Sequence, residues 1–283
     1  MNKKNKAKAS VAGATAQQSQ NGVVGSKNNN NMIKHHSKII YQPSGKAAEY
    51  SSWAANLYNG CSNGCNYCYN NKGITAPVLG GLTVRLKKSL GDEKNAKRIF
   101  RDELAKWKKP IIADGGLHFT FVSDPCLPET IDLTWWCIDY AILQRVPVQV
   151  LTKRADWLNH PAVKGALKAS QLIRVGFSLT GCDELEPGAS PNLERIQAMR
   201  KLHDAGIATW ASFEPIIDPQ KSLEMIERSL DCCDHYKIGV LSGKKSYTPD
   251  QIRQFVSSVK ALNARSVYWK KGLLDFINKQ QTK

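Results

Sequence analysis

Short apolar runs alternate with amphipathic stretches from Ile39 to the end of the sequence, and this alternation constrains the fold most strongly. An apolar run of about four to eight residues is typical of a strand, whereas apolar residues that recur every three or four positions are typical of a helix. Residues 92–107 have the helical spacing, and Gly91-Asp92 supplies a break and an N-cap before them. Strands that alternate with helices indicate parallel β/α units.

The alternation predicts an α/β fold with six strands. Six strands fit a partial TIM barrel, an open (β/α)6 relative of the eight-stranded barrel. We expect Pro161 to break the third helix, and residues 267–277 to pack on the core as a short strand and a helix. The expected strands are residues 54–58, 117–123, 147–152, 172–179, 207–213 and 236–241, and the expected helices are residues 92–107, 129–144, 155–169, 191–205, 220–232 and 248–263.

Polar residues follow the predicted strands at the points where the strands end. In barrels of this kind the chemistry takes place at the carboxyl ends of the strands. Ser123 and Asp124 follow the second strand, Lys153 the third, Ser178 the fourth and Glu214 the fifth. We therefore expect these side chains to face one mouth of the barrel. Asp124 precedes a proline, and the alternative for this residue is a capping or bracing role in its turn.

Three cysteines, Cys61, Cys65 and Cys68, lie within eight residues with the spacing CxxxCxxC. Gly60 and Gly64 lie before and between them, and glycine tolerates the positive φ angles that would turn three thiols toward one centre. Three thiolates without a fourth ligand nearby suit an iron–sulfur cluster that leaves one iron open. A structural zinc site would need a fourth protein ligand and usually has CxxC pairs. Zinc and purely structural thiols remain the alternatives.

The composition is that of an ordinary soluble globular protein, with 42% hydrophobic and 23% charged residues. No apolar run approaches the roughly 20 residues that cross a bilayer, and no signal peptide is evident. We expect a cytoplasmic monomer without membrane contact. In the cytoplasm, eight cysteines favour reduced thiols and metal ligation over disulfides. Packing thiols are expected at Cys137, Cys182, Cys232 and Cys233.

The net charge is +16, and residues 1–38 contribute seven lysines and no acidic residue. Residues 1–37 are rich in Lys, Asn, Gln, Ser and Ala, so we expect a disordered basic tail, in which Met32 is an alternative start. Residues 38–283 are expected to form one core domain with a helical extension at the C-terminal end. The basic body is compatible with nucleic acid as a partner. The alternative is a solvated lysine-rich surface, because no nucleic-acid-binding motif accompanies the charge.

The cysteine loop, with Tyr67 directly before its last cysteine, resembles the cluster loop of the radical S-adenosylmethionine (SAM) superfamily. The strand ends are similar to one branch of that superfamily, the group around spore photoproduct lyase. The similarity spans residues 53–243. It consists of Ser123-Asp124-Pro125, Thr152-Lys153, Ser178-Leu179-Thr180, Glu186-Pro187-Gly188 and Arg195.

The resemblance implies a radical SAM enzyme in which Cys61, Cys65 and Cys68 hold a 4Fe–4S cluster. In that superfamily the open iron binds SAM, and the reduced cluster cleaves SAM to methionine and a 5′-deoxyadenosyl radical. A reductant such as flavodoxin or ferredoxin is implied as a partner. Glu186 and Arg195 are expected to form an ion pair that braces their loop. Further implied SAM contacts are Ser123, Lys153, Ser178 and Tyr67, the last near the adenine. Glu214 is an acid among apolar neighbours at a strand end, where it could hold SAM or substrate, and a purely structural pairing with Arg195 is equally open.

The resemblance breaks at Val122, because spore photoproduct lyase carries at this position a cysteine that returns a hydrogen atom to the substrate radical. The nearest thiol is Cys126, a candidate for a relocated hydrogen donor or a small apolar loop residue. Photoproduct repair is therefore not supported by the residues, and the sequence does not name the substrate. Two alternatives stay open: a radical SAM enzyme that repairs or modifies nucleic acid, and a zinc-stabilised nucleic-acid-binding protein.

Overall fold

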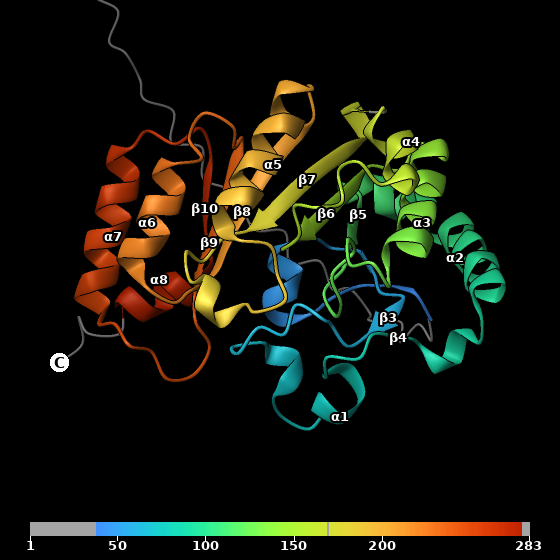
Figure 1. Ribbon diagram of the computed structural model, residues 1–283, viewed down its shortest axis with the longest axis horizontal. Helices are drawn as coiled ribbons and strands as arrows, with labels where there is room; N and C mark the ends of the chain where they lie inside the picture. Colours follow the sequence, from blue (N-terminus) through green and yellow to red (C-terminus); the bar gives the residue numbers. More distant parts are fainter. Residues whose placement is uncertain (1–37, 169, 279–283) are drawn as a thin grey trace, which may run out of the picture. The chain divides into compact units, whose positions relative to one another are not determined.

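The structure is a computed structural model that describes residues 38–168 and 170–278, and it shows an open α/β barrel (Figure 1). The predicted partial TIM barrel is thereby confirmed. The predicted basic tail, residues 1–37, lies outside the described residues. Its disorder and the domain boundary at residue 38 therefore stay predictions.

The main sheet of the described chain has eight strands, with β1 at one edge and β10 at the other. β1 pairs antiparallel with β2, whereas the later neighbours pair in parallel. The carboxyl ends of the parallel strands therefore meet at one mouth of the barrel. The strands are β1 (Ile40–Tyr41), β2 (Ala54–Ala55), β5 (Leu117–Phe119), β6 (Val148–Thr152), β7 (Ile173–Ser178), β8 (Ala208–Ile216), β9 (His235–Val240) and β10 (Val267–Trp269).

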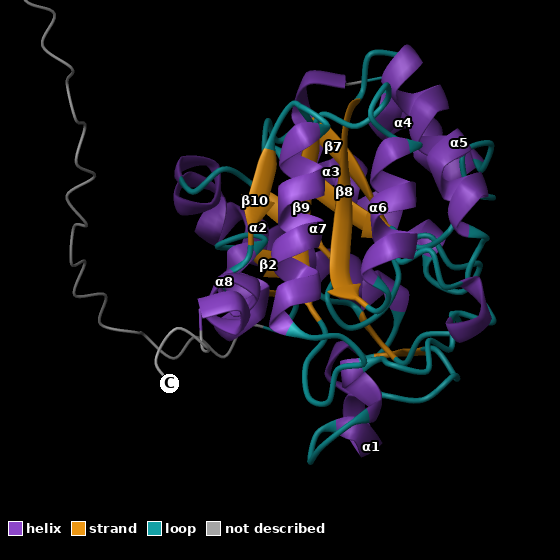
Figure 2. Cartoon of the chain, turned by 90° about the vertical axis from the view of Figure 1, so that its left-hand side faces the viewer, coloured by secondary structure: helices purple, strands orange, loops and turns teal. Residues whose placement is uncertain are grey.

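Helices connect the parallel strands and cover the outer face of the sheet (Figures 1 and 2). Their starts follow local capping chemistry: the Asp92 side chain accepts a hydrogen bond from Asn95 N before α2, and Thr248 forms a capping box with Gln251 before α7. The helices are α1 (Ala76–Leu79), α2 (Glu93–Ala113), α3 (Ile131–Leu143), α4 (Lys164–Leu167), α5 (Asn192–Asp204), α6 (Pro219–Glu227), α7 (Pro249–Ala261) and α8 (Lys271–Asn278).

Apolar side chains that are buried between sheet and helices form one core, to which Val150 of β6, Ile138 of α3 and Phe177 of β7 belong. The predicted strand and helix after residue 267 are present as β10 and α8. Within residues 38–168 and 170–278, no helix is both long and apolar enough to cross a membrane.

The second strand was expected to reach residue 123, but β5 ends at Phe119. The Asn56 side chain explains the early end, because its Oδ1 accepts a hydrogen bond from the backbone N of Phe121 at 2.9 Å. That N–H group is therefore not available to the neighbouring strand. Residues 120–123 form a loop at the barrel mouth in place of the strand end.

The predicted break at Pro161 is confirmed, but the helix expected at residues 155–169 is shorter than predicted. A 3-10 turn at Pro161–Val163 precedes the four-residue α4. Pro161 has no backbone N–H and cannot continue a helix from the preceding residues. The His160 side chain caps the new turn by accepting a hydrogen bond from Ala162 N at 3.3 Å.

A small second sheet holds the segment that carries the three cysteines. β3 (Tyr58–Asn59) pairs antiparallel with β4 (Arg85–Leu86), and the two strands close the connection between them. The sequence predicted that the cysteine loop directly follows the first barrel strand. In the structure the loop instead starts after β3, which belongs to the second sheet. Because β3 pairs with β4, residues 60–84 form a closed loop between the two strands.

Candidate functional site

The cysteine loop is folded tightly against residues 79–83. Gly60 N donates a hydrogen bond to Leu79 O and Cys61 N to Gly81 O, each at 2.9 Å. Gly60 has a φ of +79°, and a Cβ atom at this position would lie 2.2 Å from Thr83 O. Only glycine fits both the backbone angle and the close approach, so this residue fixes where the loop begins.

All three loop cysteines line one small cavity, which is partly open to solvent. Asn70 lines it as well, and its Oδ1 atom is buried without a hydrogen bond while its Nδ2 atom donates to Val122 O at 2.9 Å. The remaining walls are mainly glycine backbone and apolar side chains, from Gly64, Leu79, Gly80, Gly81 and Val122.

The donor set of this cavity fits a cluster better than a single ion. Three free thiols face it, and no fourth His, Cys, Asp or Glu side chain lines it. In the part of the chain that the structure describes, no three His, Cys, Asp or Glu side chains are placed to hold one metal ion together. Three thiols without a fourth ligand match a 4Fe–4S cluster with one open iron, whereas structural zinc needs four ligands.

In the free chain, burial favours the protonated form of two loop thiols, Cys61 and Cys65. Burial raises the pKa of Cys61 to about 12, and the nearby Asp124 carboxylate adds to the shift. Burial also raises the pKa of Cys65, although the Lys153 ammonium opposes the change. Metal ligation requires thiolates, so loading of the site would release protons.

Asp124 braces the junction between the cysteine loop and the barrel strands. Its carboxylate accepts hydrogen bonds from Asn63 Nδ2 at 2.8 Å, Thr152 Oγ1 at 2.7 Å, Lys153 N at 2.7 Å and Cys126 N at 2.9 Å. Asp124 is 7% exposed, and the four donors occupy both oxygens of its carboxylate. The bracing role considered for Asp124 is thus confirmed.

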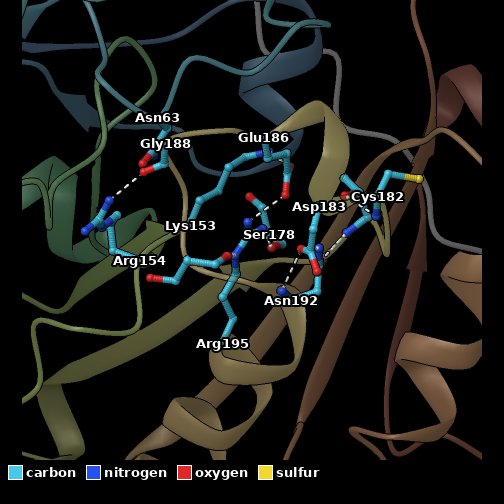
Figure 3. A network of polar contacts seen from close by, with 12 residues as sticks. Asn63, Lys153, Arg154, Ser178, Cys182, Asp183, Glu186, Gly188, Asn192 and Arg195 are labelled. Atoms are coloured by element: carbon cyan, nitrogen blue, oxygen red, sulfur yellow. Dashed lines mark hydrogen bonds and ion pairs between the residues drawn. The ribbon is translucent and has the colours of Figure 1, made fainter.

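Lys153, Glu186 and Arg195 form a polar network (Figure 3). Tyr67 joins this network through its hydroxyl. The Lys153 ammonium contacts both the Tyr67 hydroxyl and Glu186 Oε1. Arg195 Nη2 donates to Glu186 Oε2 at 2.6 Å, and its Nη1 donates to Ser178 O at 2.8 Å. The predicted ion pair between Glu186 and Arg195 is confirmed, and it links β7 to the loop that faces Lys153.

Two cations control the charge of this network. Burial opposes ionisation of Glu186, but Lys153 and Arg195 outweigh it and lower the pKa of the carboxyl to about 2. Burial and the Glu186 charge raise the pKa of Tyr67 well above its usual value. Glu186 is therefore a carboxylate and Tyr67 a neutral hydrogen-bond donor throughout the physiological range.

The two serines predicted to contact SAM follow or end barrel strands: Ser123 lies in the loop after β5, and Ser178 is the last residue of β7. Ser123 is 9% exposed, and its hydroxyl is buried without a hydrogen-bond partner, so this group can still receive one from a ligand. Ser178 ends β7, is 7% exposed, and uses its backbone carbonyl to hold Arg195. Ser178 contacts the network through Arg195. Ser123 is next in sequence to Asp124, which accepts a hydrogen bond from the backbone N of Lys153.

Glu214 belongs to a different cluster, on β8, and does not contact Arg195. Its Oε2 atom accepts a hydrogen bond from Tyr50 OH at 2.9 Å and pairs with the Lys270 ammonium. Tyr50 OH also lies 2.6 Å from Ser212 Oγ. Sequence analysis missed Tyr50 and Lys270. Lys270 directly follows β10, so the strand-end rule would have found it if residues 267–269 had been counted among the barrel strands.

Cys126 is 2% exposed, lies in the hydrophobic core and does not line the cysteine cavity. Burial raises the pKa of its thiol well above the usual value. Its role as a hydrogen donor stays a prediction, to which this placement adds no support. Val122 does line the cavity beside the three loop cysteines. The four remaining thiols are buried as expected, at Cys137, Cys182, Cys232 and Cys233.

Comparison with known proteins agrees with this architecture. A mutant of spore photoproduct lyase with bound AdoMet and dinucleoside spore photoproduct superposes with a TM-score of 0.59, at 15% sequence identity, over 81% of this chain and 80% of that one. The chain shares the fold of spore photoproduct lyase. A radical S-adenosylmethionine methyltransferase, TsrM from Kitasatospora setae, aligns with a TM-score of 0.41 at 14% identity over 77% of this chain and 35% of that one, which is too distant to bear on the fold.

A relative by sequence is the uncharacterized protein ORF301 of Acidianus two-tailed virus, 24% identical over 211 residues. The match covers 69% of this chain and 66% of the relative, so the chain spans slightly less than two thirds of that protein. No family model matches the sequence.

Proposed function

We propose that the chain is a radical SAM enzyme in which Cys61, Cys65 and Cys68 hold a 4Fe–4S cluster. The observation that carries the proposal is the single cavity onto which all three thiols of the CxxxCxxC loop open, without a fourth ligand. The open barrel and its likeness in fold to spore photoproduct lyase support the same reading. The bound cluster and SAM would supply a 5′-deoxyadenosyl radical, which abstracts hydrogen from a substrate.

Lys153 is the residue proposed to bind the carboxylate of SAM. An ammonium has three donors, and the structure uses them on Tyr67 and Glu186 only in part. The Lys153 side chain is 17% exposed, so a ligand can reach it from the barrel mouth. Glu186 and Arg195 position Lys153, since the buried ion pair fixes the carboxylate that the ammonium contacts.

Ser123 and Ser178 are proposed to complete the SAM site. The Ser123 hydroxyl lacks a partner and can donate a hydrogen bond to the amino-acid or ribose part of SAM. Tyr67 is proposed to lie near the adenine through the backbone of the cysteine loop, because its hydroxyl is engaged by Lys153 and Glu186. For Glu214 we propose the structural role, because Tyr50 and Lys270 already satisfy its carboxylate.

Metal content tests the proposal. Protein that is purified and reconstituted without oxygen should bind about four irons per chain and absorb near ~400 nm. The Cys61→Ala/Cys65→Ala/Cys68→Ala variant should bind none, whereas Cys232→Ala, at a buried thiol far along the chain, should bind as much as the wild type. One zinc per chain without this absorption would instead support a structural zinc site.

A radical SAM enzyme that acts on nucleic acid is the second candidate, and one surface feature favours it. Lys97 Nζ and the Arg101 guanidinium lie 5.3 and 5.2 Å from the ring centre of Trp136, whose ring stacks on that of Tyr140. Cations beside stacked aromatic rings suit contact with nucleic acid. This candidate predicts oligonucleotide binding that weakens steeply with salt, and flat salt dependence would count against it.

A further inference from the structure

The segment that follows the cysteine loop exposes an unusual number of large apolar side chains. Nine large apolar side chains are exposed among the described residues, and four of these lie within residues 69–82. Ile74 is 99% exposed, and the other three are Tyr69 at 61%, Val78 at 62% and Leu82 at 63%. Exposed apolar residues that are concentrated in one segment indicate an interaction site, because scattered ones are the norm on a monomer.

This segment forms the outer wall of the cysteine cavity. Leu79, Gly80 and Gly81 line the cavity from the inside. Leu82 Cδ2 lies 3.2 Å from the position that a Cβ atom of Gly64 would occupy, so Leu82 covers the loop between the first two cysteines. Figures 1 and 2 both show α1 projecting away from the helices around the barrel. A molecule that bound this surface would be separated from the thiols by one layer of chain.

The charged residues within the segment itself all have one sign. Residues 60–91 contain four basic residues and no acidic residue. Lys72, Arg85 and Lys88 are exposed. The fourth, Lys87, turns inward and donates to Lys38 O at 2.7 Å and Asn56 O at 3.0 Å. The segment thus combines exposed apolar side chains with exposed cations, and this combination is complementary to an acidic protein with an apolar contact patch.

We propose that the surface formed by Tyr69, Lys72, Ile74, Val78, Leu82 and Lys88, here called the loop surface, is the docking site for an acidic one-electron carrier protein. The inference rests on the proposed function, because a carrier is needed only if the three thiols hold a redox cofactor. The carrier would be oxidised by one electron and the cofactor reduced by one, without proton or group transfer. Encounter complexes of this kind use small interfaces, which a segment of this size can supply.

Chemistry distinguishes this occupant from nucleic acid. The loop surface is mainly apolar with exposed cations, whereas α2 carries Lys94, Lys97, Arg98, Arg101 and Lys106. Of these, Lys97 and Arg101 lie over the ring of Trp136. Nucleic acid needs many phosphate contacts and would favour the α2 face. A protein partner needs an apolar patch at the centre of its contact and would favour the loop surface.

Flavodoxin, an acidic one-electron carrier, is the probe for the test. Its dissociation constant from the reconstituted protein would be measured without oxygen by titration calorimetry, together with the rate of 5′-deoxyadenosine formation that it supports. Ile74→Asp and Lys72→Glu/Lys88→Glu should each weaken binding about tenfold or more. Leu143→Asp, at a leucine that is 76% exposed at the end of α3, and Lys164→Glu on α4 are matched controls and should leave binding unchanged.

Dithionite separates failure of this proposal from failure of the proposed function. It reduces the cofactor without docking, so 5′-deoxyadenosine formation with dithionite should stay within about twofold of wild type in all four variants. Unchanged flavodoxin affinity in Ile74→Asp would overturn the docking site even if dithionite supports the reaction. Loss of oligonucleotide affinity in Ile74→Asp, with flavodoxin affinity retained, would overturn it in favour of nucleic acid. Absence of product with dithionite in the wild type would instead refute the proposed function.

Discussion

Glu186 and Arg195 form an ion pair in which both side chains are fully buried, with Arg195 Nη2 2.6 Å from Glu186 Oε2. The second carboxylate oxygen contacts the Lys153 ammonium. One carboxylate thus joins a helix that packs on the barrel, α5, to the lysine at the end of β6. The pair sets the position of Lys153, and several consequences can be measured.

Replacement of Glu186 by glutamine should lower the free energy of unfolding by about 3 kcal/mol, because it leaves the buried Arg195 guanidinium without a counter-charge. Urea denaturation monitored by circular dichroism measures the change. Glu184→Gln is the matched control, since Glu184 forms an exposed ion pair with Lys221. The control should change stability by less than about 1 kcal/mol. Equal effects of the two substitutions would contradict the structural role of the buried pair.

Stability in acid should depend on Glu186. Its pKa is about 2 in the folded chain and near 4.5 when unfolded, so the unfolded state binds the proton first as the pH falls. The stabilisation is complete above pH 4.5 and is lost between pH 4.5 and 2, at up to about 1.4 kcal/mol per pH unit. Urea denaturation at pH 6, 4 and 3 measures the free energy of unfolding, which should fall more steeply with decreasing pH in the wild type than in Glu186→Gln. An equal pH dependence in the two proteins would show that another group dominates stability in acid.

Lys153→Met should weaken SAM binding to the reconstituted protein by about 10- to 100-fold, because a charge-assisted hydrogen bond contributes roughly 1.5–3 kcal/mol. Equilibrium dialysis with labelled SAM gives the dissociation constant. Lys164→Met, at an exposed lysine that opens α4, should leave the constant unchanged. Iron content should stay at the wild-type value in both variants. Unaltered SAM affinity in Lys153→Met would remove this residue from the proposed site.

Glu214→Gln should destabilise the fold more than it weakens SAM binding. Lys270 is 1% exposed and pairs with Glu214, so the substitution leaves a buried ammonium without its main partner. We expect a loss of about 3 kcal/mol in the free energy of unfolding and a change of less than about threefold in SAM affinity. The opposite pattern, with SAM affinity reduced and stability kept, would assign Glu214 to the ligand site.

The sequence was sufficient for the architecture because hydrophobic periodicity survives in strands such as Val148–Thr152 and helices such as α5. It failed where one side chain overrides the local pattern. Asn56 takes the N–H of Phe121 and ends β5 early. This effect cannot be read from periodicity, because it depends on a residue 65 positions away in the sequence. The break at Pro161 was predictable, because the absence of a backbone N–H is a property of the residue itself.

The strand-end rule located Lys153, Ser123 and Ser178, because the carboxyl ends of parallel strands meet at one mouth whatever the loops do. The rule by itself does not say which cation pairs with each acid. The pair of Glu186 with Arg195 was implied by the family resemblance and is present. The pair of Glu214 with Lys270 was missed, because Lys270 follows β10, which was not counted among the barrel strands.

The central claim is that the three-cysteine cavity supports reductive cleavage of SAM, and formation of 5′-deoxyadenosine tests it most directly. Protein reconstituted with iron and sulfide would be incubated anaerobically with SAM and dithionite, and the product measured by liquid chromatography. The account predicts 5′-deoxyadenosine from the wild type and none from the variant in which Cys61, Cys65 and Cys68 are all alanine. Equal product from both proteins, or none from a wild type that binds four irons, would contradict it.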